Sequence, residues 1–198
     1  MIWRYGLIIV VSYLLGSIST GVLLTKNLDK NIMEEGSHSS GATNAMRVFG
    51  KKIGIATFVG DFIKSALSIL FGCLLVGHPY GAMVAVFFAI IGHSWPVFFG
   101  FKGGKGIACS SAAMFLLFPI EGIIAHLVFA LVLFTTKYVS LGSLLMLSSY
   151  ALLLTITHGF WPFGAWALLL TACAFYRHKA NIHRLMNGTE NKSFSKKK

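Results

Sequence analysis

Two lysines stand among four glycines in the stretch Phe99–Gly106, which reads FGFKGGKG. Glycine lets the backbone curl its N–H groups around an oxyanion, and lysine adds a positive point charge. These residue types at this spacing favour a cradle for a phosphate group. The stretch is not a nucleotide P-loop, because that motif needs glycine at position 99 and serine or threonine at position 106, where this chain has Phe99 and Gly106.

A second polar stretch, EEGSHSSGATNAMR, runs from Glu34 to Arg47. Arg47 can close over a phosphate with two parallel hydrogen bonds. The same stretch supplies small side-chain donors or bare backbone N–H groups at Ser37, Gly41, Thr43 and Asn44. It is predicted to be a second phosphate-binding loop, with an ordinary loop rich in turn residues as the alternative.

A third stretch, HKANIHRLMNGTE, runs from His178 to Glu190. Its polar residues recur every three positions and therefore project to adjacent places on a helix: His178, Asn181 and Arg184. An apolar stripe lies beside them, made of Ile182, Leu185 and Met186. The pattern predicts a short helix on the membrane surface, with a plain amphipathic tail as the alternative. The final Lys196–Lys198 run is typical of a solvated or lipid-seeking tail.

The composition is that of a membrane protein. Of the 198 residues, 56% are hydrophobic and only 12% are charged. The chain has 17 Lys and Arg but only 6 Asp and Glu, and this excess of positive charge favours anionic partners. Nucleic acid is disfavoured, because the basic residues are spread among short loops without an aromatic stacking platform. The cysteines lack the spacings of a zinc site or a redox pair, so no metal is expected: Cys73, Cys109 and Cys173.

Apolar runs close to the length that spans a bilayer can be recognised along the chain. They are Ile2–Leu24, Ile55–Val76, Gly81–Phe99, Val139–Thr157 and Phe163–Tyr176. Between Ile107 and Thr135, Pro119 interrupts a further apolar stretch and Glu121 follows it, a pair that suits a turn at the lipid surface. This stretch is either one long helix or two short ones.

The distribution of charge favours two helices and seven spans in all. With a turn at Pro119, 15 of the 17 Lys and Arg fall on one side, Arg4 falls on the other, and Lys64 lies within a span. The positive-inside rule then places the N-terminus outside and the C-terminus in the cytoplasm. Six spans would leave the basic tail outside. A cleaved signal peptide ending near Ser17–Ser19 is the alternative for the first span.

Asp61 and Lys64 lie within the second span, three residues apart, where they can neutralise one another. Ionisable groups inside a membrane are candidates for function, and a structural ion pair near the interface explains these two equally well.

The three polar stretches, with GDFIKS at Gly60–Ser65, resemble the bacterial acyl-phosphate:glycerol-3-phosphate acyltransferases through almost the whole chain. The resemblance implies an all-α polytopic membrane protein of about seven transmembrane helices with its active site on the cytoplasmic side of the bacterial plasma membrane. It implies one membrane-embedded domain, 1–198, in which 177–198 forms an interfacial helix and basic tail. The implied reaction moves a fatty acyl group from acyl-phosphate to the 1-hydroxyl of glycerol 3-phosphate without a cofactor, giving lysophosphatidic acid and phosphate.

The resemblance also implies site residues. Acyl-phosphate is assigned to Ser37, Gly41, Thr43, Asn44, Gly103 and Gly104, and glycerol 3-phosphate to Arg47, Lys105, His178 and Asn181. Lys102, Arg184 and Ser143 are further candidates. Acyl-phosphate carries a good leaving group, so positioning and charge stabilisation can supply most of the catalysis. The proton acceptor is left open between His178 and a phosphate oxygen of the substrate.

The chain departs from the family pattern in one place. Family members usually read G-S-G-N-x-G-A-T-N in the first motif, whereas here His38 and Ser39 replace a glycine and an asparagine. Histidine is poorly suited to a left-handed backbone, so an acyltransferase of altered specificity is one alternative. A small transporter for a phosphorylated anion is another, although the chain has no visible internal repeat. Acyltransferases with a His-x4-Asp pair are disfavoured, because none of the seven histidines is followed by such an aspartate.

Overall fold

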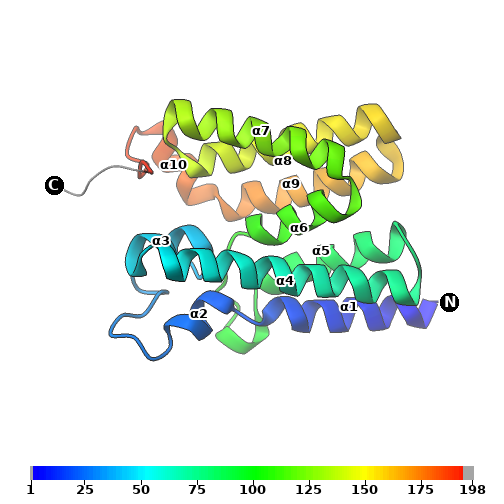
Figure 1. Cartoon of the computed structure of the whole chain (residues 1–198), viewed down its shortest axis with the longest axis horizontal. Helices are drawn as coiled ribbons and strands as arrows, with labels where there is room; N and C mark the ends of the chain where they lie inside the picture. Colours follow the sequence, from blue (N-terminus) through cyan, green and yellow to red (C-terminus); the bar gives the residue numbers. More distant parts are fainter. Residues whose placement is uncertain (1, 194–198) are drawn as a thin grey trace. The chain divides into compact units, whose positions relative to one another are not determined.

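The computed structural model describes residues 2–193, and every regular element in that range is a helix (Figure 1). The chain forms two compact units, unit 1 from Met1 to Leu117 and unit 2 from Phe118 to Lys198. The basic run Lys196–Lys198, predicted to be a tail, lies outside the described residues.

Unit 1 is organised around one long helix. Its elements are α1 (Ile2–Ser17), α2 (Thr20–Thr25), α3 (Ala42–Phe49), α4 (Lys51–Leu75), α5 (Tyr80–Ser94), a 3-10 turn (Val97–Phe99) and α6 (Ile107–Leu117). Helix α4 packs against each of the other five α-helices, and Figure 1 shows it running alongside α1. Helix α4 is therefore the central helix of unit 1.

Glycines let the long helices of unit 1 approach closely. A Cβ added at Gly16 of α1 would overlap the carbonyl of Ala89 in α5, and one at Gly92 would overlap the carbonyl of Tyr13. In the same way, a Cβ at Gly72 of α4 would overlap the carbonyl of Gly81 in α5, and a Cβ at Gly81 would overlap the carbonyl of Gly72. Helix association in lipid depends on such close packing, because burying apolar side chains gains little there.

Unit 2 contains α7 (Pro119–Thr136), α8 (Val139–His158), a π-helical turn (Phe160–Gly164), α9 (Ala165–Arg177) and α10 (Lys179–Met186). Helix α8 touches α7, α9 and α10 and is the centre of the unit. Pro119 begins α7, where its missing N–H costs no helical hydrogen bond. The predicted break at Pro119 is therefore confirmed.

Helices α7 and α8 are joined by a polar contact that the sequence analysis did not foresee. The buried Glu121 accepts hydrogen bonds at Oε1 from Thr157 Oγ1 (2.9 Å) and from His158 Nε2 (3.0 Å). The rings of Phe118 and Phe163 flank His158, with centroids 4.9 and 5.7 Å away. Glu121 thus fixes the start of α7 against the end of α8.

Five helical segments within residues 2–193 are long and apolar enough to cross a membrane: Ile2–Thr25, Lys51–Leu75, Tyr80–Phe99, Pro119–Thr136 and Val139–His158. Helices α6 and α9 are shorter, with 11 and 13 residues. The prediction of an all-helical membrane protein is confirmed in this range. The number seven and the direction of insertion stay predictions, because helix length does not decide them.

Candidate functional site

The predicted phosphate-binding stretch Glu34–Arg47 folds as a loop followed by helix α3, and the loop, Asn31–Gly41, is called the first loop because it precedes the glycine loop in the chain. It is built around the side chain of Asn44. This side chain is 2% exposed. Its Nδ2 lies 3.0 Å from the carbonyls of Ile32 and Glu35 and 2.9 Å from that of Ser39, and its Oδ1 accepts from the backbone N–H of Ser37 at 2.8 Å. The amide is engaged with the loop backbone on both sides. Asn44 therefore sets the shape of this first loop.

Two residues of the first loop have left-handed backbone conformations. Gly36 has φ +64°, and a Cβ there would overlap the Asn44 amide, so only glycine fits without a shift. His38 has φ +52°, which costs a side-chain-bearing residue roughly 1–2 kcal/mol relative to glycine. The structure thus confirms that the histidine which replaces the family's glycine has a left-handed backbone conformation.

Helix α3 presents a polar face directly after the first loop. It begins after Gly41, and Thr43 and Arg47 lie four residues apart on it. Both side chains are exposed, whereas Asn44 is turned inward. Residues at this spacing share one face of a helix, so the Thr43 hydroxyl and the Arg47 guanidinium lie on the same face of α3.

The glycine loop, Lys102–Gly106, is held against the end of α5. The N–H of Gly104 donates to the carbonyl of His93 at 3.0 Å. A Cβ at Gly103 would overlap that same carbonyl, and a Cβ at Gly104 would overlap the imidazole of His93. Neither position accepts a larger residue without displacing α5 or its side chain.

The glycine loop leads directly into α6. Gly106 has φ +79°, and its carbonyl accepts the N–H of Ser110 in the first turn. Lys105 is half-buried and Lys102 is exposed. Backbone N–H groups, a helix N-terminus and two ammonium groups are the features that bind a phosphate.

A buried polar cluster lies beneath the glycine loop. Asp61 and Lys64 form the predicted pair, with Asp61 Oδ1 2.9 Å from Lys64 Nζ, and Thr20 Oγ1 donates to the same oxygen at 3.2 Å. Lys64 Nζ also reaches the carbonyl of Ile18 at 2.7 Å and His93 Nδ1 at 3.0 Å. Asp61, Lys64 and His93 are 1%, 6% and 4% exposed.

In unit 2, Glu190 gathers the polar side chains of the third stretch. Its Oε1 accepts from Ser140 Oγ at 3.0 Å and from Asn181 Nδ2 at 2.7 Å, and its Oε2 accepts from Arg184 Nε at 2.7 Å. Burial alone would raise the pKa of Glu190, but these hydrogen bonds and the charge of Arg184 hold that pKa below its usual value. The carboxylate ties α10 to α8.

His178 lies where α9 ends and α10 begins, and it is 2% exposed. Its Nδ1 lies 2.8 Å from the carbonyl of Ala174, which can only accept, so Nδ1 carries a proton. In the neutral ring Nε2 is then the acceptor nitrogen. Ser143, also buried, donates its hydroxyl to the carbonyl of Val139 at 2.8 Å.

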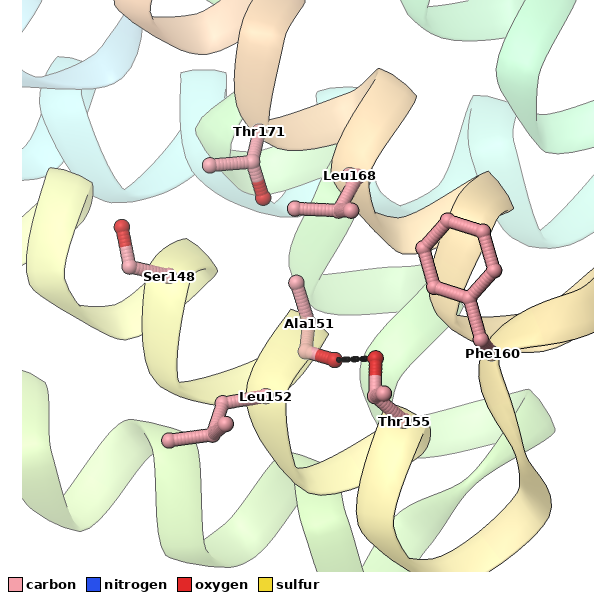
Figure 2. Close-up of a pocket in the computed structure, with 7 residues that line it drawn as sticks. All are labelled: Ser148, Ala151, Leu152, Thr155, Phe160, Leu168 and Thr171. Atoms are coloured by element: carbon pink, nitrogen blue, oxygen red, sulfur yellow. Dashed lines mark hydrogen bonds between the residues drawn. The ribbon is translucent and has the colours of Figure 1, made fainter.

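The hollow between α8 and α9 in unit 2 is a groove of about 330 Å³ (Figure 2). Its lining is mainly apolar, and its two threonines donate to carbonyls of their own helices, Thr155 to Ala151 and Thr171 to Ala167, both at 2.8 Å. None of the predicted site residues, all within residues 2–193, lines it. This groove is therefore not formed by the residues predicted to bind phosphate.

Comparison with known proteins agrees with this chemistry. The family model described as glycerol-3-phosphate acyltransferase matches residues 6–188. The chain belongs to this family. A glycerol-3-phosphate acyltransferase of Clostridioides difficile (strain 630) is 40% identical over 202 residues, which cover 99% of this chain and 98% of the relative. One of Thermoanaerobacter pseudethanolicus (strain ATCC 33223 / 39E) is 39% identical over 184 residues, or 92% of each chain.

Solved structures of this family include the glycerol 3-phosphate form of PlsY (YgiH), an integral membrane glycerol 3-phosphate acyltransferase. It matches with a TM-score of 0.88 at 33% identity, covering 95% of this chain and 94% of that one. The lysophosphatidic acid form of the same protein matches with a TM-score of 0.84. The resemblance drawn from the motifs is confirmed, and with it the prediction of a multi-pass membrane acyltransferase.

Sequence reasoning left two central side chains without a role. His93 stands in the motif GHSWPVFFGFKGGKG, ten residues before Gly103, and Glu190 closes the third motif. Their positions in these motifs were the available signal, but each also contacts a residue far along the chain, Lys64 for His93 and Ser140 for Glu190. The individual site residues stay predictions. Within residues 2–193, no group of three or more His, Cys, Asp or Glu side chains could hold a metal ion.

Proposed function

We propose that the chain transfers a fatty acyl group from acyl-phosphate to the 1-hydroxyl of glycerol 3-phosphate, giving lysophosphatidic acid and phosphate. The main support for this proposal is the glycine loop. Gly103 and Gly104 pack closely on α5, directly before the N-terminus of α6, and Lys102 and Lys105 lie on either side of them in the chain. The N–H of Gly104 is already donated to His93, so the N-terminus of α6 and the two ammonium groups are the features that favour a phosphate here. Membership in the family supplies the reaction class.

In this mechanism the phosphate of the donor rests on the glycine loop and the first loop, on the groups assigned above to acyl-phosphate. Ser37, Gly41 and Thr43 offer hydroxyl or backbone donors, whereas Asn44 acts by shaping the loop that presents them. The acyl chain stays in lipid while the phosphate stays at the interface, which accounts for a phosphate cradle in a chain that is 56% hydrophobic.

Glycerol 3-phosphate is assigned to Arg47, Lys105, His178 and Asn181, with Lys102, Arg184 and Ser143 as further contacts. The 1-hydroxyl oxygen attacks the acyl carbonyl carbon, and the bond from that carbon to the phosphate oxygen breaks. The hydroxyl proton passes to His178 Nε2 or to a phosphate oxygen. Cationic groups favour the step because negative charge develops on the carbonyl oxygen and the leaving phosphate.

The proposal includes the topology. Seven spans, with α6 and α9 as the two short ones, place the N-terminus outside and the C-terminus in the cytoplasm, since 15 of the 17 Lys and Arg then face inward. Residues 1–198 act as one membrane-embedded domain, with 177–198 as its interfacial helix and tail. The partners are acyl-phosphate, glycerol 3-phosphate and the lipids of a bacterial plasma membrane.

A direct assay tests the proposed function. Purified protein is supplied with palmitoyl phosphate and radiolabelled glycerol 3-phosphate, and lysophosphatidic acid and released phosphate are measured together. Equal molar formation of the two products is expected. Palmitoyl coenzyme A in place of palmitoyl phosphate provides the control and should give no product. A chain that releases neither product, as a transporter would, contradicts the proposal.

Replacing His38 with glycine is expected to stabilise the protein. The change removes a left-handed histidine, and the free energy of unfolding should rise by about 1 kcal/mol. Thermal unfolding in detergent measures the effect. Glu35→Gly is the matched control: Glu35 is exposed in the same loop and lacks a positive φ, so glycine there should lower the unfolding temperature. A lower unfolding temperature for His38→Gly would contradict the strain argument.

A further inference from the structure

The buried cluster of unit 1 touches both phosphate loops. On one side Gly21 of α2 packs against the carbonyl of Ser40 in the first loop, and its neighbour Thr20 donates to Asp61. On the other side His93 underlies Gly104. A continuous path of contacts, buried from Asp61 onward, therefore runs from the first loop to the glycine loop.

The ammonium group of Lys64 fixes the orientation of the His93 ring. An ammonium has three N–H donors, and Lys64 Nζ has three acceptors within reach: Ile18 O (2.7 Å), Asp61 Oδ1 (2.9 Å) and His93 Nδ1 (3.0 Å). His93 Nδ1 also lies 3.5 Å from Asp61 Oδ1, so the lysine and the carboxylate together hold the Nδ1 edge of the ring and leave the Nε2 edge for its other neighbours. That Nε2 edge is the one that meets Gly104.

The imidazole cannot easily turn away from the glycine loop. His93 is 4% exposed, its backbone carbonyl already accepts the N–H of Gly104, and moving the ring would break its contacts with the buried Lys64 and Asp61. Breaking a buried hydrogen bond leaves a desolvated polar group unsatisfied, which is costly and more so when the group is charged. The three atoms closest to a Cβ at Gly104 all belong to this ring.

We propose that His93 is a positioning residue for the transfer reaction, with its ring, pinned by Lys64 and Asp61, supporting the backbone of the glycine loop in its phosphate-binding shape. The proposal rests on the proposed function for the identity of the phosphate ligand. His93 acts through Gly103 and Gly104 and does not itself touch substrate.

Two double-mutant cycles test this role. The first combines His93→Asn with Gly104→Ala. Asparagine keeps an acceptor near the position of Nδ1 for Lys64 but lacks the ring tip under Gly104, so a loss of activity would not simply reflect an unpaired Lys64. Gly104→Ala alone forces its methyl against the ring, and misplacement of the loop by about 1 Å should lower kcat/KM for palmitoyl phosphate about 100-fold. Adding His93→Asn should recover about tenfold, as expected for residues in contact.

The second cycle combines His93→Asn with Gly103→Ala and is the matched control. A Cβ at Gly103 meets the backbone carbonyl of residue 93, which asparagine retains, so no recovery is expected. His93→Asn alone should raise KM for palmitoyl phosphate more than KM for glycerol 3-phosphate. A residue that only satisfied Lys64 would show wild-type constants as asparagine, and recovery in both cycles or in neither would overturn the proposal.

Stability measurements separate this proposal from the proposed function. The rise in unfolding temperature caused by inorganic phosphate reports on the glycine loop without any acyl transfer. If the parent makes no lysophosphatidic acid, the proposed function fails. The role of His93 is then decided by the rise in unfolding temperature with phosphate, which Gly104→Ala should abolish. The proposal requires that this rise returns in the double variant of the first cycle and stays absent in the double variant of the second.

Discussion

Replacing Lys105 with alanine is expected to lower kcat/KM for lysophosphatidic acid formation roughly 10- to 150-fold, because a hydrogen bond to a charged group is worth about 1.5–3 kcal/mol. Lys105 is half-buried beside Gly104, where its charge is less screened than in water. Arg47→Ala should have an effect of similar size, since a guanidinium can hold a phosphate through two parallel bonds.

Initial rates at varied palmitoyl phosphate and glycerol 3-phosphate measure both effects. Lys52→Ala supplies the control, because Lys52 is an exposed cation in the first turn of α4 and belongs to neither phosphate loop. It should retain parental rates and unfolding temperature. If Lys105→Ala and Arg47→Ala also retain them, neither cation binds substrate and the assignment of both fails.

The helices of this protein were largely predictable from the sequence. A run of about 20 apolar residues is a local property, and the chain has few alternatives to a helix in lipid, because every backbone polar group must be satisfied internally. The interruption at Pro119 was predictable for the same reason, since a proline cannot continue a helix interior without loss of a hydrogen bond. The number of spans was harder, because α6 has only 11 residues.

The motif residues were also found from sequence, but their individual roles were not. The sequence predicts that Asn44 donates a hydrogen bond to a phosphate. In the structure its side-chain amide instead forms hydrogen bonds with four backbone groups of the first loop. Whether an asparagine faces a ligand or a loop depends on the path of a chain segment twelve residues away. Residue type alone does not contain that information.

The roles of His93 and Glu190 escaped prediction because each side chain has a partner on another helix, distant in sequence. His93 meets Lys64, 29 residues away, and Glu190 meets Ser140, 50 residues away. Helical spacing identifies neighbours three or four residues apart, as it did for Asp61 and Lys64, and is silent about contacts between helices. Both buried residues organise polar groups that the sequence did identify, so the structure adds how the site is held in shape.

Replacing Glu190 with alanine is expected to destabilise unit 2 by about 1–3 kcal/mol, because it removes the carboxylate that accepts from Ser140, Asn181 and Arg184. Thermal unfolding in detergent should show a drop of several degrees. Glu190→Gln keeps an acceptor oxygen but loses the charge, so it should fall between the parent and Glu190→Ala. Glu35→Gln, an exposed carboxylate in the first loop, is the charge-matched control and should leave the unfolding temperature unchanged.

The pH dependence of this effect has a definite sign. The pKa of Glu190 is lowered in the folded protein, so the folded state favours the ionised carboxylate. Its contribution is fully present above the unfolded pKa of about 4.3 and is lost as the pH falls through the lower folded value. The gap in unfolding temperature between the parent and Glu190→Gln should therefore be constant from about pH 7 to pH 5 and shrink toward pH 3. A gap that stays constant into acid would show that Glu190 stabilises α10 through packing, and equal unfolding temperatures at pH 7 would show that its charge contributes nothing.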